Sequence, residues 1–88
     1  MEFPMKHTEI ENLIVSRGAN LRIINTLQKF LSASTAPPDM DKFYTGHGEG
    51  FIFFFDHGMI EVETRGDKGV ILGIMSNELN IDLYDFIS

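Results

Sequence analysis

Two glutamates separated by one residue, Glu61 and Glu63, are the strongest candidates for acid–base chemistry in this sequence. Side chains two positions apart on a strand point to the same side, so these carboxylates are expected to be neighbours. Such a pair works in catalysis when burial makes one member an acid and the other a base. Carboxylates on a strand more often line a solvated face, and we interpret Glu61 and Glu63 in that way.

The histidines offer a second kind of chemistry, because histidine and carboxylate side chains bind zinc when three or four of them converge. His47 and Glu49 precede an expected strand over 51–56, whereas Asp56 and His57 stand at its other end. A rise of about 3.3 Å per residue keeps the two ends of that strand too far apart for one site. We therefore expect no metal centre and an exposed His57.

Other catalytic arrangements are excluded or lack a signal. The sequence has no cysteine, so thiol nucleophiles, thiolate ligands and disulfides are excluded. No Ser/His/Asp set stands out among the serines and the three histidines. A deep pocket is also hard to form within 88 residues. We expect neither catalysis nor a cofactor.

The glycine-rich segment Gly46–Gly50 has some likeness to a phosphate-binding loop, because its glycines would allow close approach of a ligand. It lacks the lysine and the hydroxyl residue of a Walker motif, and Glu49 would repel phosphate. We interpret the segment as a flexible hairpin loop.

A three-stranded antiparallel meander between Gly50 and Met75 would position these side chains. The aromatic segment 51–56 is typical of a strand. A two-residue turn at His57-Gly58, with Gly58 at positive φ, would then start the next strand. This turn predicts three cross-strand pairs: Asp56 with Met59, Phe55 with Ile60, and Phe53 with Val62.

The second turn has two alternatives. A turn over 65–69 with Gly69 in the left-handed conformation places Val70, Leu72 and Ile74 on the face of Phe53. A two-residue loop at Gly66-Asp67 would place Ile71 and Gly73 there instead. We prefer the first because it gathers the larger residues. Arg65-Gly66-Asp67 is also the tripeptide that integrins recognise, but glycine and aspartate are what a hairpin turn favours.

The two faces of this meander differ in character. One is apolar; it carries Phe51, Phe53, Phe55, Ile60 and Val62. The other combines Ile52 and Phe54 with Glu61 and Glu63. A strand that is apolar on both sides needs cover on both. The second face could be covered by the C-terminal segment, a second copy of the chain, or a foreign partner.

Residues His7 to Ser34 are the helical part of the sequence, with Thr8 as the expected N-cap of a capping box. An apolar stripe recurs every three or four positions, at Ile10, Leu13, Ile14, Leu21, Ile24, Leu27 and Leu31. Gly18 suits a helix end and Asn20 the start of another helix. The stripe keeps its phase across Gly18, which favours one helix over two.

The remaining segments complete the predicted fold. Pro37-Pro38 ends the helical part, and a short strand is expected over 42–45. A short C-terminal helix is expected within 76–88, with Ser76 as its cap. Its apolar face would be formed by Leu79, Leu83, Phe86 and Ile87. The predicted fold class is therefore α+β: an N-terminal helix packed on a three- to four-stranded meander, followed by a short C-terminal helix.

Length and charge narrow the class of function. With 88 residues the chain predicts one domain, with residues 1–5 as a loose tail. Seven Lys and Arg against 13 Asp and Glu give a net charge of −6, which disfavours nucleic-acid binding. No apolar run approaches the ~20 residues of a membrane span, and we expect no membrane association. The absence of cysteine suits the cytoplasm.

We expect a non-catalytic protein-binding module of the inhibitor, immunity or small-regulator kind, with a basic partner. The expected partner-binding residues are Ile52, Phe54, Glu61, Glu63, Asp82 and Asp85. A self-associating scaffold that uses the same sheet face for a homodimer is the alternative. A helix-turn-helix DNA-binding regulator comes last, because the overall charge opposes it.

Overall fold

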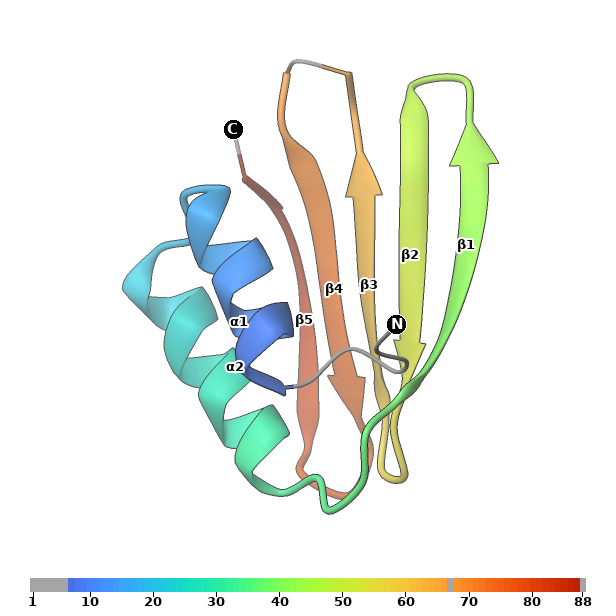
Figure 1. The fold of residues 1–88 in the computed structure, drawn as a ribbon. Helices are drawn as coiled ribbons and strands as arrows, with labels where there is room; N and C mark the ends of the chain where they lie inside the picture. Colours follow the sequence, from blue (N-terminus) through green and yellow to red (C-terminus); the bar gives the residue numbers. More distant parts are fainter. Residues whose placement is uncertain (1–6, 67, 88) are drawn as a thin grey trace.

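The computed structural model describes residues 7–66 and 68–87, except for the side chains of residues 7–9 and Leu13. The predicted tail over 1–5 lies outside the described residues, and so does the side chain of Thr8, on which the predicted cap depends. Within these ranges two helices precede five strands (Figure 1): α1 (His7–Ser16), α2 (Leu21–Ser32), β1 (Asp39–Thr45), β2 (Gly48–Phe54), β3 (Met59–Thr64), β4 (Val70–Ser76) and β5 (Ile81–Ile87).

The described strands form one antiparallel sheet in chain order, β1-β2-β3-β4-β5. The predicted fold class is wrong, because the sheet has five strands in the described residues and the last of them replaces the predicted C-terminal helix. Short connections explain the order, since antiparallel strands joined by short loops pair with their neighbours.

β1 and β2 pair over a longer stretch than the sequence indicated. β1 begins at Asp39 rather than at residue 42, and Thr45 pairs with Gly48. Only Gly46 and His47 remain in the turn, so the predicted five-residue glycine loop is wrong. The turn is closed by the Thr45 hydroxyl, which accepts a hydrogen bond from the His47 backbone N–H at 3.0 Å.

The loop between β2 and β3 has four residues, 55–58, rather than two. It is closed by the Phe55 N–H, which donates to the Gly58 carbonyl at 2.8 Å, and Gly58 does not adopt positive φ. Phe53 therefore pairs with Ile60 and Phe54 with Met59, two positions away from the predicted register. A shift of two keeps every side chain on its predicted face, because strand side chains alternate with period two.

The preferred register of the next hairpin is confirmed. Val62 pairs with Leu72 and Thr64 with Val70, and Val70, Leu72 and Ile74 are buried on the face of Phe53. Gly69 adopts a φ of 145°, and its carbonyl accepts a hydrogen bond from the Arg65 N–H at 2.9 Å.

The C-terminal segment forms β5, and the predicted helix is wrong. Ser76 caps only one turn, over residues 77–80: its hydroxyl accepts from the Leu79 N–H at 3.2 Å, and Asn80 then adopts a φ of 55°. Such a φ leaves the helical path. From Ile81 to Ile87 the chain pairs along all of β4.

The helical part consists of two helices, so the preference for one continuous helix is wrong. Gly18 adopts a φ of 90°, which ends α1, and the Asn20 side chain caps α2 by accepting from the Ile23 N–H at 3.0 Å. The predicted stripe is also partly wrong, because Leu21 is exposed. The buried side chains of α2 are Ile23, Leu27, Phe30 and Leu31.

The two helices lie side by side over the β5 side of the sheet, and β1 forms the far edge (Figure 1). They cover the face that carries Phe53, so the core lies between the helices and this face. The members of the core contributed by the sheet are Phe53, Ile60, Val62, Val70, Leu72, Ile74, Ile81, Leu83 and Ile87. The helices lie on one face only, which leaves the opposite face as the place to search for a site.

Candidate functional site

The face of the sheet opposite the helices is named the open face, because no described residue covers it. Its positions follow from the cross-strand pairs, since directly paired residues point to the same side. Row by row from β1 to β5, its residues are Asp39, Phe54, Met59, Met75 and Asp82; Asp41, Ile52, Glu61, Gly73 and Tyr84; and Phe43, Gly50, Glu63, Ile71 and Phe86.

The open face exposes large apolar side chains. Phe54, Met75, Tyr84 and Phe86 keep 42%, 43%, 61% and 50% of their surface accessible. They belong to β2, β4 and β5, so the exposure extends across the sheet rather than being confined to one strand. Contiguous apolar exposure on a folded domain commonly marks an interaction surface.

Two glycines on the open face are overlaid by aromatic rings. The Phe43 ring of β1 occupies the space that a Cβ at Gly50 would need, and the Tyr84 ring of β5 lies 2.9 Å from the Cβ position of Gly73. Both rings belong to edge strands and lie over the neighbouring strand. They make the outer parts of this face aromatic.

The open face is also acidic. Five carboxylates are distributed over its rows, at Asp39, Asp41, Glu61, Glu63 and Asp82. Lys42 lies on the side of the sheet that carries the helices, named here the helix face, because it pairs with Phe51 on β2. One of the five carboxylates, that of Glu63, lies 3.3 Å from the Nε of Arg65.

The structure brings five of the six predicted site residues onto one face. Ile52, Phe54, Glu61 and Glu63 lie together on β2 and β3, and Asp82 lies at the β5 edge. Asp85 does not belong to the group: it lies on the helix face, where its carboxylate is 3.6 Å from the Arg22 guanidinium. Side chains three positions apart point to opposite sides of a strand, so Asp82 and Asp85 lie on different faces, whereas the predicted helix would have placed them on the same face.

The sequence interpretation missed a hollow at one end of the open face, named here the loop-end hollow. It has a volume of about 560 Å³ and lies between the β1–β2 turn and the β3–β4 loop. It is lined by Gly46, His47, Arg65, Gly66, Lys68, Ile71 and Phe86. Gly66 N–H donates to the His47 carbonyl at 2.8 Å, which joins the two loops. This contact links residues 19 positions apart, and nothing in the local sequence indicates it.

His57 is half-buried and hydrogen-bonded, so its predicted exposure is wrong. Its Nε2 lies 2.8 Å from the Ser34 hydroxyl and 3.1 Å from the Phe30 carbonyl, and its Nδ1 lies 3.0 Å from the Ser76 hydroxyl. These contacts tie the C-terminal end of α2 to β4.

His57 and His47 belong to loops at opposite ends of β2. Among the described residues, no group of three or more histidine and carboxylate side chains is placed to hold a metal ion. Within the same residues, neither helix is long and apolar enough to cross a lipid bilayer.

Comparison with known proteins found no relative: no family model, no curated protein and no solved structure matches this chain. Two features of the structure bear on function: the apolar and acidic open face, and the loop-end hollow with its cations.

Proposed function

We propose that this chain is a small, non-catalytic protein-binding module whose open face binds a partner with a basic surface. The observation that carries the proposal is the combination of exposed apolar side chains and five carboxylates on a face that no described residue covers. Protein interfaces combine apolar anchors with complementary charge. An inhibitor, an immunity protein or a small regulator in the cytoplasm would use such a face.

The proposed roles follow from position. Phe54 and Ile52 are apolar anchors on β2, and Glu61 on β3 is the direct cross-strand neighbour of Ile52. A partner that covers Phe54 must also cover Glu61, so a lysine or arginine on the partner would compensate the loss of water around that carboxylate. Asp82, at the β5 edge, would form part of the rim of the interface.

Self-association through the same face takes second place. Two copies stacked face to face would bring the five carboxylates of one chain against the five of the other, and like charges across an interface repel. A heterologous partner with basic side chains has no such penalty. The carboxylate positions therefore favour a foreign partner over a homodimer.

DNA binding by α1 and α2 remains the weakest candidate. A reader helix needs free polar side chains, yet Arg22 pairs with Asp85, and the Gln28 amide donates to the Glu11 carboxylate at 2.9 Å. The net charge of −6 opposes approach to a phosphate backbone.

The proposal is tested with three single variants used as immobilised bait. Phe54→Glu and Glu61→Lys change the open face, whereas Leu21→Glu makes a matched apolar-to-acidic change at a residue 70% exposed on α2. Because Leu21 is the first residue of α2, a glutamate there also suits the helix N-terminus. Circular dichroism and thermal unfolding establish that all three variants fold.

We expect a partner that binds the wild-type chain and Leu21→Glu but neither open-face variant. With the purified partner, each open-face variant should weaken binding by about tenfold or more, the effect typical of an interface hot spot. Binding should also weaken as salt is added. Partner capture that Phe54→Glu and Glu61→Lys both leave unchanged would refute the proposal.

A further inference from the structure

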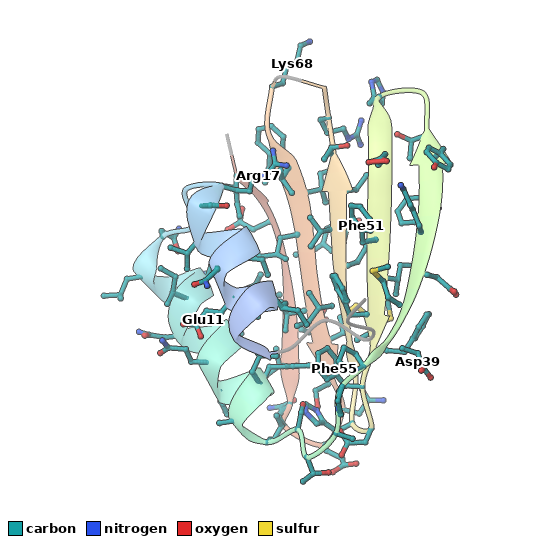
Figure 2. The ribbon with its side chains drawn as sticks, in the orientation of Figure 1. Glu11, Arg17, Asp39, Phe51, Phe55 and Lys68 are labelled. Atoms are coloured by element: carbon teal, nitrogen blue, oxygen red, sulfur yellow. The ribbon has the colours of Figure 1, made fainter. Side chains whose placement is uncertain are left out.

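The described charged side chains that line the loop-end hollow are cationic, opposite in sign to the net charge of the chain. Its walls include the guanidinium of Arg65, the ammonium of Lys68 and the imidazole of His47, in a chain of net charge −6. Lys68 lies at one end of the sheet, and Asp39 lies near the other (Figure 2). The other described lysines and arginines lie elsewhere, on α2 and its preceding loop or on the helix face: Arg17, Arg22, Lys29 and Lys42.

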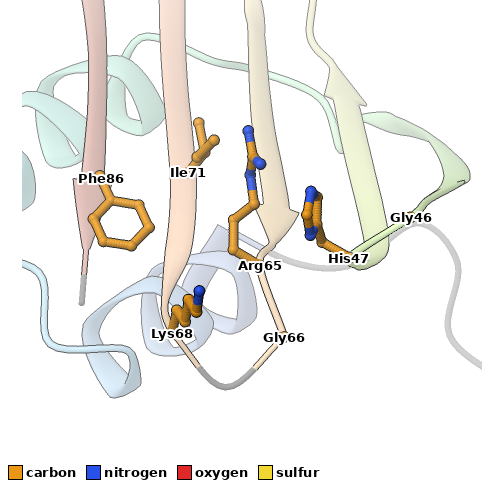
Figure 3. Close-up of a pocket in the computed structure, with 7 residues that line it drawn as sticks. All are labelled: Gly46, His47, Arg65, Gly66, Lys68, Ile71 and Phe86. Carbon is orange, nitrogen blue, oxygen red and sulfur yellow. The ribbon is translucent and has the colours of Figure 1, made fainter.

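Arg65 has hydrogen-bonding capacity that the described residues do not use. Its Nε is buried and makes no hydrogen bond with them, and its 3.3 Å contact with Glu63 is an ion pair without hydrogen-bond geometry. Buried donors are nearly always satisfied, so an unsatisfied one calls for an explanation. The side chain as a whole is 38% exposed and extends between Ile71 and His47 in the hollow (Figure 3).

The other polar groups of the hollow are available as well. No described residue forms an ion pair or a hydrogen bond with the Lys68 ammonium or the His47 imidazole; the hydrogen bond of His47 to Thr45 uses its backbone N–H. Imidazole can donate an N–H in its neutral form as well as in its charged form, and the lysine ammonium offers three donors. Among the described residues, the permanent cations of the hollow are Arg65 and Lys68, and the carboxylate in contact with them is that of Glu63 beside Arg65.

The remaining walls are apolar. Ile71 and Phe86 are direct cross-strand neighbours on β4 and β5, and Phe86 is half exposed. A volume of about 560 Å³ falls within the range of small-molecule sites, which combine apolar walls with a few polar groups that fix orientation.

We propose that the loop-end hollow binds a small organic anion, in which a carboxylate or phosphate head is attached to an apolar, flat body. The head meets the Arg65 fork and Lys68, since guanidinium groups bind carboxylates and phosphates through paired hydrogen bonds. The body lies on Ile71 and Phe86. The hollow shares Ile71 and Phe86 with the open face, but its cations do not belong to the proposed partner interface, and the anion site does not depend on that proposal.

The test uses the free, isotope-labelled chain and four probes in an NMR titration. Phenylacetate and phenyl phosphate carry the two heads on the same ring, phenylacetamide is the neutral counterpart, and inorganic phosphate has no apolar body. We expect saturable shifts at residues 46–48, 65–66, 68–71 and 86 with one or both aromatic anions. The stronger of the two identifies the head. Phenylacetamide and inorganic phosphate should bind at least tenfold more weakly, the loss expected when one charged hydrogen bond or the apolar contact is removed.

Variants locate the binding. Arg65→Gln, Lys68→Gln and Phe86→Ala should each weaken binding by about tenfold, whereas Lys29→Gln, a matched loss of one charge near the end of α2, should leave it unchanged. Lys68 is exposed, so its substitution keeps the test valid if Arg65→Gln disturbs the loop. Any one of three results would overturn the proposal: no saturable shifts with either aromatic anion, binding of phenylacetamide as tight as that of the aromatic anions, or binding of inorganic phosphate as tight as theirs.

Discussion

Lys42 shows how one residue is positioned by its neighbours on the helix face. Its ammonium lies 2.8 Å from the Glu49 carboxylate and within 5.4 Å and 5.8 Å of the Tyr44 and Phe51 ring centres. Hydrogen bonds with Glu49 and, secondarily, with Tyr44 raise the pKa of Lys42 above 10.5. All these partners come from the paired strands β1 and β2, so the raised pKa of Lys42 depends on the formation of that hairpin.

This pKa predicts a pH dependence. Because the folded chain holds the Lys42 proton more tightly, the ion pair stabilises the fold below pH 10.5, and this contribution disappears as pH rises through the higher folded-state pKa. An NMR titration of the Lys42 side chain should give a value above 10.5, and Glu49→Gln should lower it. Identical titration curves for the two proteins would contradict the assignment.

His57 explains why sequence patterns failed at particular residues. Asp-His-Gly between two apolar segments is typical of a two-residue hairpin turn, and the sequence pattern therefore predicted such a turn. The actual loop is fixed by the contacts of His57 with Ser34, Ser76 and the Phe30 carbonyl. These partners are 19 to 27 positions away, so a local pattern holds no information about them.

At the scale of elements, Gly58 and Gly46 make a matched pair of turn glycines. A Cβ on Gly58 would collide with the Met75 carbonyl and approach the Phe30 ring to 2.9 Å, whereas a Cβ on Gly46 would have no atom within 4 Å. Neither glycine adopts positive φ, so the two positions differ in the free space around an added Cβ and not in backbone strain.

We expect Gly58→Ala to lower the free energy of unfolding by about 1–3 kcal/mol, the range for overpacking. Gly46→Ala should change it by about 0.5 kcal/mol or less, as for an ordinary surface substitution. Urea unfolding of both variants measures the difference. Equal stabilities would show that the β2–β3 loop can move away from β4 at little cost.

The strands show which elements could be predicted. The register of β3 and β4 was predicted correctly because it places the large side chains of Val70, Leu72 and Ile74 on the face of Phe53, and because Gly69 marks the turn. β5 was missed because Leu79, Leu83, Phe86 and Ile87 also match a helical spacing. The decisive contribution comes from β4, whose whole edge pairs with residues 81–87.

At the scale of the whole molecule, the charge distribution predicts the oligomeric state. With a net charge of −6 and five carboxylates on the open face, the purified chain should be monomeric at about 0.15 M salt. Light scattering coupled to size-exclusion chromatography should give the 10.0 kDa mass of one chain. At about 1 M salt, where screening reaches within about 3 Å, the exposed apolar side chains should promote association. A stable dimer at 0.15 M would instead favour the self-association alternative.

The two candidate sites differ in how far the sequence predicts them. The part of the open face on β2 and β3 was predicted, because alternation alone places Ile52, Phe54, Glu61 and Glu63 on one side of a hairpin. The loop-end hollow was not, because His47 and Arg65 belong to different hairpins, and only the completed sheet brings their loops together.

The order of the strands also has a consequence during protein synthesis. α1 and α2 leave the ribosome before the described strands, yet α2 packs against β4 and β5, the last described strands to be made. Each strand can pair with its predecessor as it emerges, and Phe30 meets Phe55 and His57 of the β2–β3 loop, but the packing of α2 is complete only when residues 70–87 have followed. The nascent chain therefore exposes an apolar helix surface from the time α2 emerges until β4 and β5 have followed, and this interval is where a chaperone would have most to bind.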